Sequence, residues 1–533
     1  AETESNNLHN NLSQNKEPFI KESRHGISNL DSNANYDDNG RHSNETSESK
    51  VIDINKRDNE ENNYLDQEQV NTDKEDYNEY YKGKSSYKEG RKWYEKCFSN
   101  VLPGSIRGSI FNLSILSIGA GCLTLPQRFG QISITLAIIE IIVAGLASYW
   151  TLKMLIYGAI RCGETTYSKV VTSICGKGWG RFLDITLVIY VFGQVIVDQI
   201  IIYQMIGAFV YDVGNFPDHK TQQDFYDNSF WGKLWFKVVV MVGLAVVILL
   251  PLNLLKDVTK FRFTSITGIF CLIIVVIIMI AQFPSYIEDY WDNKYIESDE
   301  STHINWYDMG KGFTSDLLFF KASATLFYAY TCHHGLFPIY ERLLENSRPR
   351  TYKVLNRSTL LGGFFYILAG TIGYITSPIN TPAFIVEREK LGGRDIAMTI
   401  GRLLIVMLLV AKIPVKHNCF RISVFEMIWG DSREIQTTRN LSIAIPFTII
   451  TALIGALYSK LDEYISLFGG FCAVMIAFFF PAFIYIKSNE RPMKDLKNMF
   501  TIIGVGILIT VGIIASILSV ITIIKEAVDG DAK

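Results

Sequence analysis

The sequence predicts an all-α polytopic membrane protein with eleven transmembrane helices behind a polar N-terminal tail. Apolar runs of about 20 residues, long enough for a helix to cross a bilayer, recur from about residue 105 to the end. Hydrophobic residues make up 48% of the 533 residues and charged residues 20%, and charge is much denser before residue 95 than after it. Because backbone groups in lipid must be paired within the segment, these runs are expected to be helices.

Residues 1–95 form the first predicted region, a disordered, Asn-rich tail. Sixteen Asn lie among Asp, Glu, Ser and Lys in the first 80 positions, with few apolar residues to offset the entropy of ordering. The start, AETESNNLHNNLSQN, lacks a basic segment followed by an apolar one, so no cleavable signal peptide is expected. The tail is interpreted as a solvated extension, with a regulatory or sorting role as the alternative.

Residues 96–533 are predicted to form the transmembrane domain. Its spans are expected at residues 106–127, 132–157, 182–210, 233–252, 263–284, 316–340, 355–377, 395–415, 440–458, 464–486 and 498–524. With the tail in the cytosol, the connections on that side carry 21 Lys and Arg residues, including Lys416 and Arg421, and those on the opposite side carry nine. Since positive residues favour the cytosolic side, the N-terminus is expected in the cytosol.

Several classes of protein are excluded by composition and motifs. The net charge of −2 argues against a strongly basic nucleic-acid binder, and eight cysteines without a CxxC pair argue against a disulfide scaffold or a zinc ribbon. No Ser-His-Asp order, phosphate loop or metal-ligand cluster is found in the sequence. The sequence therefore predicts no catalytic residues, no cofactor and no bound metal.

Two spans contain helix-breaking residues near their middle. In the first span, Gly119 and Gly121 precede Pro126, and in the sixth, Gly335 and Pro338 follow two histidines. These are corresponding positions if spans 1–5 and 6–10 are inverted repeats with span 11 added. Paired broken helices at matching positions indicate a transporter's binding site, where freed amides suit a carboxylate and freed carbonyls an ammonium.

The motifs FNLS…IGAGCLTLP in span one, HHGLFPIYERL in span six and IPVKHNCFR at the end of span eight resemble the amino acid/auxin permease family over residues 104–525. The resemblance implies the inverted-repeat fold of the leucine transporter type and an amino acid substrate. An Asn-rich tail before such a core is similar to that of apicomplexan parasite members. Carried over by position, the substrate-binding residues are Ile118, Gly119, Ala120, Gly121 and Cys122, with Tyr330, Thr331, Cys332, His333 and His334.

The sequence departs from the sodium-coupled branch of that family at two positions. Where the resemblance implies an Asn and a Thr that help to hold sodium, this chain has Ile115 and Lys412. An alkyl group offers no oxygen and an ammonium repels a cation, so coupling to sodium is not expected. Lys412 is interpreted either as a tethered cation in place of sodium, able to gain and lose a proton, or as a side chain that extends to the cytosolic interface.

Other ionisable residues fall inside predicted spans, where charge is costly and often functional. Asp198 and Lys321 are expected to pair with each other in a structural role. Glu140 is either a proton relay or a buried, protonated acid. His333 and His334 either titrate in an acidic compartment or cap the broken helix.

The sequence thus predicts a sodium-independent amino acid transporter or facilitator that works by alternating access and can couple to protons. Its expected partners are the amino acid, the lipid bilayer and protons, and its expected location is the plasma membrane or an acidic vacuole or lysosome-like membrane. Three alternatives stay open: an amino-acid-sensing transceptor that signals through the tail, a channel, and a membrane enzyme.

Overall fold

The computed structural model describes residues 104–118, 120–214, 222–255, 261–291, 316–344, 347–378, 381–388, 395–430, 436–458 and 471–489, with isolated positions between 503 and 521. The predicted tail, residues 1–95, lies outside the described part, as does most of the predicted eleventh span. Within the described part, every regular element is a helix.

The described residues form the following helices, given in chain order. They are α4 (Ile106–Ser117), η2 (Ala120–Thr124), α5 (Leu125–Ile132), α6 (Ile134–Cys162), α7 (Tyr167–Cys175), α8 (Lys177–Val213), α9 (Gln222–Asn228), η3 (Phe230–Gly232), α10 (Leu234–Leu244), η4 (Ala245–Leu249), α11 (Leu250–Asn253), α12 (Phe261–Trp291), α14 (Asp316–Ala329), η6 (His333–Gly335), α15 (Leu336–Glu341), α16 (Arg348–Ile375), η7 (Ile385–Glu387), α17 (Ile396–Trp429), α18 (Thr437–Leu457), η9 (Met475–Phe479) and α20 (Phe480–Ser488).

Local sequence explains where several of these helices begin and end. The Ser133 hydroxyl accepts from the amide of Leu136 at the start of α6, and Gly163 ends that helix with a left-handed φ of 73°. The Thr166 side chain accepts from the amide of Lys169 and starts α7 four residues later. Such caps satisfy the backbone groups that a helix end leaves unpaired. Helix α7 is too short to be recognised from the sequence as a membrane span.

Among the described residues, eight helical segments are long and apolar enough to span a membrane, and they match predicted spans 1–5 and 7–9. The sixth predicted span is α14 followed by η6 and α15, with a break between them. Residues 471–486 of the tenth predicted span are helical, whereas 464–470 lie outside the described part. The total of eleven spans and the inverted repeat stay predictions.

The predicted end of the eighth span at residue 415 is wrong. Helix α17 continues to Trp429, so Lys416 and Arg421 lie within it and not in an exposed connection, and both are buried. The physical reason is that their charges have partners on neighbouring elements: Lys416 pairs with Asp198, and the Arg421 guanidinium donates to Asn440 Oδ1 and to the Leu255 carbonyl. Burial of charge is tolerated where such partners exist.

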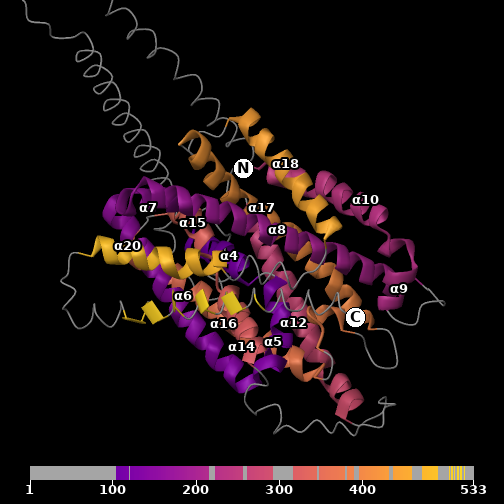
Figure 1. Ribbon diagram of the computed structural model, residues 1–533. Helices are drawn as coiled ribbons and strands as arrows, with labels where there is room; N and C mark the ends of the chain where they lie inside the picture. The colour runs from indigo at the N-terminus through magenta and orange to yellow at the C-terminus, as the bar shows by residue number, and fades with distance from the viewer. Residues whose placement is uncertain are drawn as a thin grey trace, which may run out of the picture. The chain divides into compact units, whose positions relative to one another are not determined.

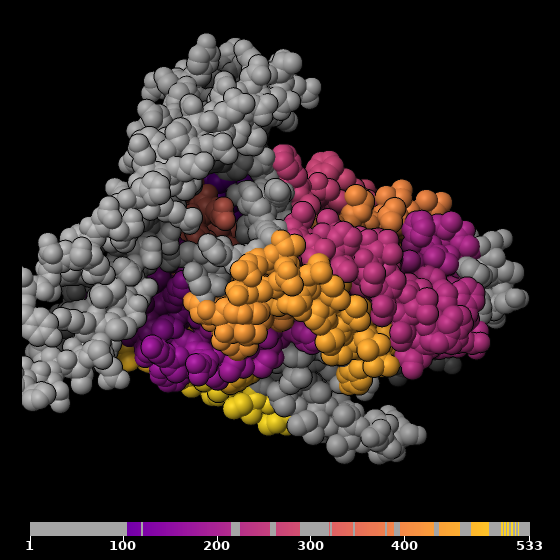
Figure 2. Space-filling model, turned by 90° about the horizontal axis from the view of Figure 1, so that it is seen from above, coloured from indigo at the N-terminus to yellow at the C-terminus, as the bar shows by residue number. Residues whose placement is uncertain are grey.

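The core is formed by α8 and α17, which pack along one another, together with α12, α4 and α16 (Figure 1). Helices α10 and α18 contact each other at the edge of the bundle, and Figure 2 shows them as adjoining magenta and orange surfaces. Large apolar side chains are exposed on this edge, including Trp235 (61%) and Val247 (74%) of the α10–η4 segment. Apolar surface of this extent is what lipid contact requires.

Candidate functional site

Both predicted breaks are present in the described residues. Helix α4 ends at Ser117, and the chain resumes as η2 and then α5, whose first turn contains Pro126. Helix α14 ends at Ala329, and three residues without helical structure precede η6. Gly119, the first glycine of the predicted site, lies outside the described residues.

Three consecutive carbonyl groups at the end of α14 accept hydrogen bonds from side-chain hydroxyls of other helices. These donors lie on α4, α6, α8 and α16: Tyr366 Oη (2.6 Å) and Ser117 Oγ (3.4 Å) donate to Ala329 O, Ser148 Oγ (3.2 Å) to Tyr330 O, and Tyr190 Oη (3.4 Å) to Thr331 O. Carbonyls that a helix end leaves free must be paired when they are buried. Four helices therefore hold the broken end of α14 in place.

A cavity lies between the two breaks, α8 and α17. Its lining comprises Leu116, Ser117, Gly121 and Thr124 from the first broken segment, Thr325, Tyr328, Ala329 and Thr331 from the second, Gln194, Val197, Asp198 and Ile201 from α8, and Lys412 and Lys416 from α17. A Cβ added at Gly121 would meet no atom within 4 Å. The absence of a side chain at Gly121 thus leaves backbone accessible from the cavity.

The cavity contains two lysines and one carboxylate. The Lys416 ammonium donates to Asp198 Oδ2 at 2.6 Å and to the Gln194 carbonyl at 3.4 Å. Lys412 lies one helical turn before Lys416 and is 5% exposed, and no described residue forms an ion pair with it. The alternative in which Lys412 extends to the interface is wrong, because α17 continues 17 residues beyond it and its side chain lines an internal cavity.

Asp198 was expected to pair with Lys321, but its carboxylate is held by Lys416. Lys321 belongs to α14, and its side chain lies outside the described part. Glu140 of α6 accepts a hydrogen bond from Ser323 of α14 at 3.0 Å, and it does not line the cavity.

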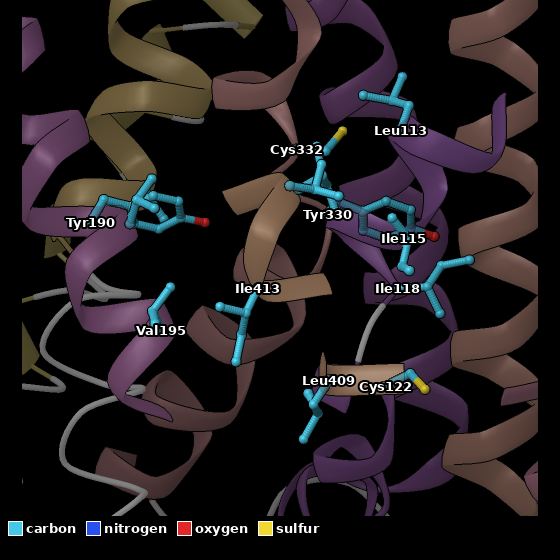
Figure 3. Close-up of a cluster of buried hydrophobic side chains, with 14 of the residues drawn as sticks. Leu113, Ile115, Ile118, Cys122, Tyr190, Val195, Tyr330, Cys332, Leu409 and Ile413 are labelled. Carbon is cyan, nitrogen blue, oxygen red and sulfur yellow. The ribbon is translucent and has the colours of Figure 1, made fainter. Parts of the chain in front are cut away.

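Ile115 packs among apolar groups and presents no oxygen ligand. A Cβ at Gly268 of α12 would lie 2.6 Å from Ile115 Cδ1 and 3.1 Å from Leu408 of α17, so the three helices approach closely here. Figure 3 shows Ile115 within the same cluster of buried hydrophobic side chains as Ile118 and Cys122. The side chains of Ile118 and Cys122 therefore belong to the core and do not line the cavity.

Among the predicted site residues of the sixth span, too, some line the cavity and others are buried in the core. Thr331 lines the cavity, whereas Tyr330 packs its ring against Tyr366 at 4.8 Å. Cys332 is buried in the core, and His333 Nε2 lies 2.9 Å from Thr151 Oγ1. His334 packs against Tyr190 with ring centroids 5.4 Å apart. Ala120 begins η2, and its side chain lies outside the described part.

Several cavity residues were not predicted as site residues, chiefly Lys416, Gln194 and Tyr328. The spacing of Lys412 and Lys416 could have indicated Lys416, because residues four apart lie on the same face of a helix and Lys412 is a predicted site residue. Among the described residues, no group of three or more His, Cys, Asp or Glu side chains is placed to hold a metal ion. The arrangement provides a polar, charged cavity at two helix breaks.

The family model and the sequence relatives that match this chain are both of amino acid transporters. A family model described as "Transmembrane amino acid transporter protein" matches residues 103–525. The chain is 23% identical over 429 residues to the sodium-coupled neutral amino acid transporter 7 of Xenopus laevis, a match that covers 76% of this chain and 86% of the relative. It is also 23% identical over 431 residues to the sodium-coupled neutral amino acid symporter 2 of Danio rerio, covering 78% and 82%.

Two solved structures are similar at 12% sequence identity. One is a Na⁺-coupled sialic acid symporter in a substrate-bound outward-open state. It matches with a TM-score of 0.47, and the match covers 78% of this chain and 88% of that chain. The other is MhsT in complex with L-phenylalanine. It matches with a TM-score of 0.45, and the match covers 77% of this chain and 98% of that chain. The relatives are transporters and not enzymes.

Proposed function

Because the chain belongs to the transmembrane amino acid transporter protein family, we propose that it carries an amino acid across a membrane by alternating access, with the substrate held between the breaks of α4–η2 and α14–η6. The resemblance drawn from the sequence motifs is thereby confirmed. The observation that carries the proposed site is the cavity lined by both breaks, including Gly121 and Thr331. Broken helices that meet at mid-membrane are the usual position of a transporter's binding site.

The proposed substrates are amino acids with neutral side chains. Leu116, Val197 and Ile201 provide apolar walls for such a side chain, and two lysines would repel a second positive charge. The names of the relatives from Xenopus laevis and Danio rerio point to the same class. The proposal includes an inverted-repeat fold in which spans one and six correspond, since their breaks contribute to one cavity.

Transport is proposed to be independent of sodium, unlike that of the sodium-coupled relatives. Ile115 is enclosed by α12 and α17 and offers no oxygen, and Lys412 brings a positive charge to the neighbouring cavity. Oxygen ligands are what a small hard cation requires. Lys412 is proposed to take the place of the cation, and protons are proposed to supply the coupling.

The membrane orientation also belongs to the proposal, with the N-terminus in the cytosol. Two of the 21 positive residues assigned to the cytosolic connections, Lys416 and Arg421, lie inside α17 and no longer count toward this assignment. The remaining excess over the nine on the opposite side still favours the same orientation. The membrane is proposed to be the plasma membrane or that of an acidic vacuole.

Uptake by the purified protein in liposomes tests the function. Twenty radiolabelled amino acids are supplied in sodium or choline buffer, with and without a pH gradient, and protein-free liposomes serve as the blank. We expect saturable uptake and counterflow of neutral amino acids, equal in the two buffers and increased by an inward proton gradient. Uptake that requires sodium would contradict the coupling, and the absence of uptake and counterflow for all twenty would contradict the function.

A further inference from the structure

The geometry points to an amino acid site with two poles, in which Lys412 binds the substrate carboxylate and the side-chain oxygens of Gln194 and Thr331 receive the substrate ammonium. This inference rests on the proposed function and assigns the side chains that recognise the two charged groups of the substrate. It differs from the expectation that backbone groups at the helix breaks alone bind these groups.

Of the two lysines in the cavity, only Lys412 is available to bind an anion, because Lys416 is already paired with Asp198. Asp198 is the only carboxylate among the described residues that line the cavity, and its Oδ2 atom is held by Lys416 at 2.6 Å. Lys412 is 5% exposed and has no ion-pair partner among the described residues. A buried ammonium without an anion is costly, and a substrate carboxylate in the cavity would remove that cost.

Two acceptor atoms of residues that line the same cavity also have no partner among the described residues. Gln194 Oε1 and Thr331 Oγ1 are buried and form no hydrogen bond with any described residue, and their residues are 6% and 2% exposed. Both residues line the cavity, Gln194 from α8 and Thr331 from the break after α14. Buried polar groups are nearly always hydrogen-bonded, so unpaired acceptors at a cavity indicate a donor that is part of the ligand.

The neighbouring contacts hold these acceptors in position. Gln194 Nε2 donates to Tyr328 Oη at 3.0 Å, which leaves Oε1 available. The Thr331 carbonyl accepts from Tyr190 Oη at 3.4 Å, which fixes the backbone that carries the Thr331 hydroxyl. An ammonium has three donors, and a hydroxyl and an amide oxygen are suitable acceptors for it. A ligand with a carboxylate but no ammonium has no group that could donate to Gln194 Oε1. The two acceptors therefore favour a zwitterionic amino acid over a simple carboxylic acid.

The test uses ligands that lack one charged group at a time. Binding of L-leucine, L-leucinamide and 4-methylpentanoate is measured on the purified full-length protein; the amide lacks the carboxylate and the acid lacks the ammonium. The matched forms of L-phenylalanine, its amide and 3-phenylpropanoate, are measured in parallel. The variants are Lys412→Met, Lys412→Arg and Thr331→Val, with Lys177→Met as the control, because Lys177 is exposed at the start of α8.

Each variant should lose sensitivity to one group only. In Lys412→Met, leucine and 4-methylpentanoate should bind roughly 10- to 100-fold more weakly, the range expected for a charge-assisted hydrogen bond, whereas leucinamide should change little. In Thr331→Val, leucine and leucinamide should weaken by about tenfold and 4-methylpentanoate should change little. Lys412→Arg should keep the preference of the parent for leucine over leucinamide, and Lys177→Met should bind as the parent does.

The outcomes separate this inference from the proposed function. If the parent binds leucine or phenylalanine but Lys412→Met weakens the acid and the amide equally, the two-pole assignment is overturned and the function stands. If the parent binds none of the twenty amino acids, both are overturned. Size-exclusion profiles and thermal unfolding establish that each variant is folded, and Lys412→Gln replaces Lys412→Met if the latter aggregates; the same equal loss in that variant would overturn the assignment.

Discussion

The ammonium of Lys416 lies 2.6 Å from the carboxylate of Asp198, a contact that joins α17 to α8 in the cavity between the two helix breaks. Both side chains are almost completely buried, at 2% and 4% exposed. With Lys412 one turn away, the cavity contains two positive groups and one negative group. This imbalance makes the consequences of removing a positive and a negative charge unequal.

Asp198→Asn should be more destabilising than Lys416→Met. The first change leaves two ammonium groups in one cavity without an anion, and loss of one partner of a buried pair costs about 3–5 kcal/mol. The second leaves Lys412 and Asp198, whose charges cancel. The double variant Asp198→Asn/Lys416→Met should lie between them, because one unpaired lysine remains. Thermal unfolding in detergent gives the order, and an Asp198→Asn variant as stable as Lys416→Met would refute it.

A bulky residue at position 121 should block the site without unfolding the protein. A Cβ at Gly121 meets no atom within 4 Å and would project into the cavity, so Gly121→Val should fold and lose at least about tenfold in leucine affinity. Gly335→Ala provides the contrast, because its Cβ would overlap the Leu116 side chain and cost about 1–3 kcal/mol. Normal uptake by Gly121→Val would show that the cavity is not the binding site.

Helix breaks could be predicted from the sequence because Gly and Pro restrict or release the backbone wherever they occur. The continuation of α17 past residue 415 could not, since KHNCFR has the composition of an exposed connection. Its burial depends on Asp198 and Asn440, which are distant in sequence. The sequence indicated Lys412 as a site residue because a charge inside an apolar span stands out. It did not indicate Gln194, because hydropathy depends on the residue type and not on the residues that surround it in the fold.

The hydroxyl of Tyr366 should stabilise the broken end of α14. It donates to the Ala329 carbonyl at 2.6 Å and lies 2.8 Å from Ser117 Oγ, so one group connects both broken segments to α16. Tyr366→Phe should cost about 1 kcal/mol, because Ser117 still reaches the same carbonyl. Tyr366→Phe/Ser117→Ala should cost more than the sum of the single changes, since the carbonyl then has neither donor. Additive effects in thermal unfolding would contradict this coupling.

The orientation can be tested with single cysteines and a membrane-impermeant thiol reagent. Asn228 is exposed in α9, and Asn228→Cys and Ser301→Cys should both react from the non-cytosolic side. Arg181 is exposed near the start of α8, and Arg181→Cys should react only from the cytosolic side. The seven described native cysteines are free, and six of them are buried, which keeps the background low. Reaction of Asn228→Cys and Arg181→Cys from the same side would break the proposed topology.

Sodium sensitivity should appear when the two departures from the sodium-coupled pattern are reversed together. Ile115→Asn places an oxygen between α4, α12 and α17, and Lys412→Thr removes the ammonium and adds a second oxygen. Sodium could then supply the positive charge that Lys412 provides in the parent. Leucine binding by the double variant should therefore be weak in choline and stronger in sodium, whereas the parent should bind equally in both.

Two controls separate coordination from a change in packing. Ile115→Val/Lys412→Thr has the same loss of charge but only one of the two new oxygens, so its binding should respond to sodium less than that of Ile115→Asn/Lys412→Thr. Lys412→Met has neither oxygen and should show no response, because sodium needs oxygen ligands and not merely an uncharged cavity. Measurements at constant ionic strength exclude general screening. An equal response of all three variants to sodium would mean that Ile115 and Lys412 do not occupy a former cation site.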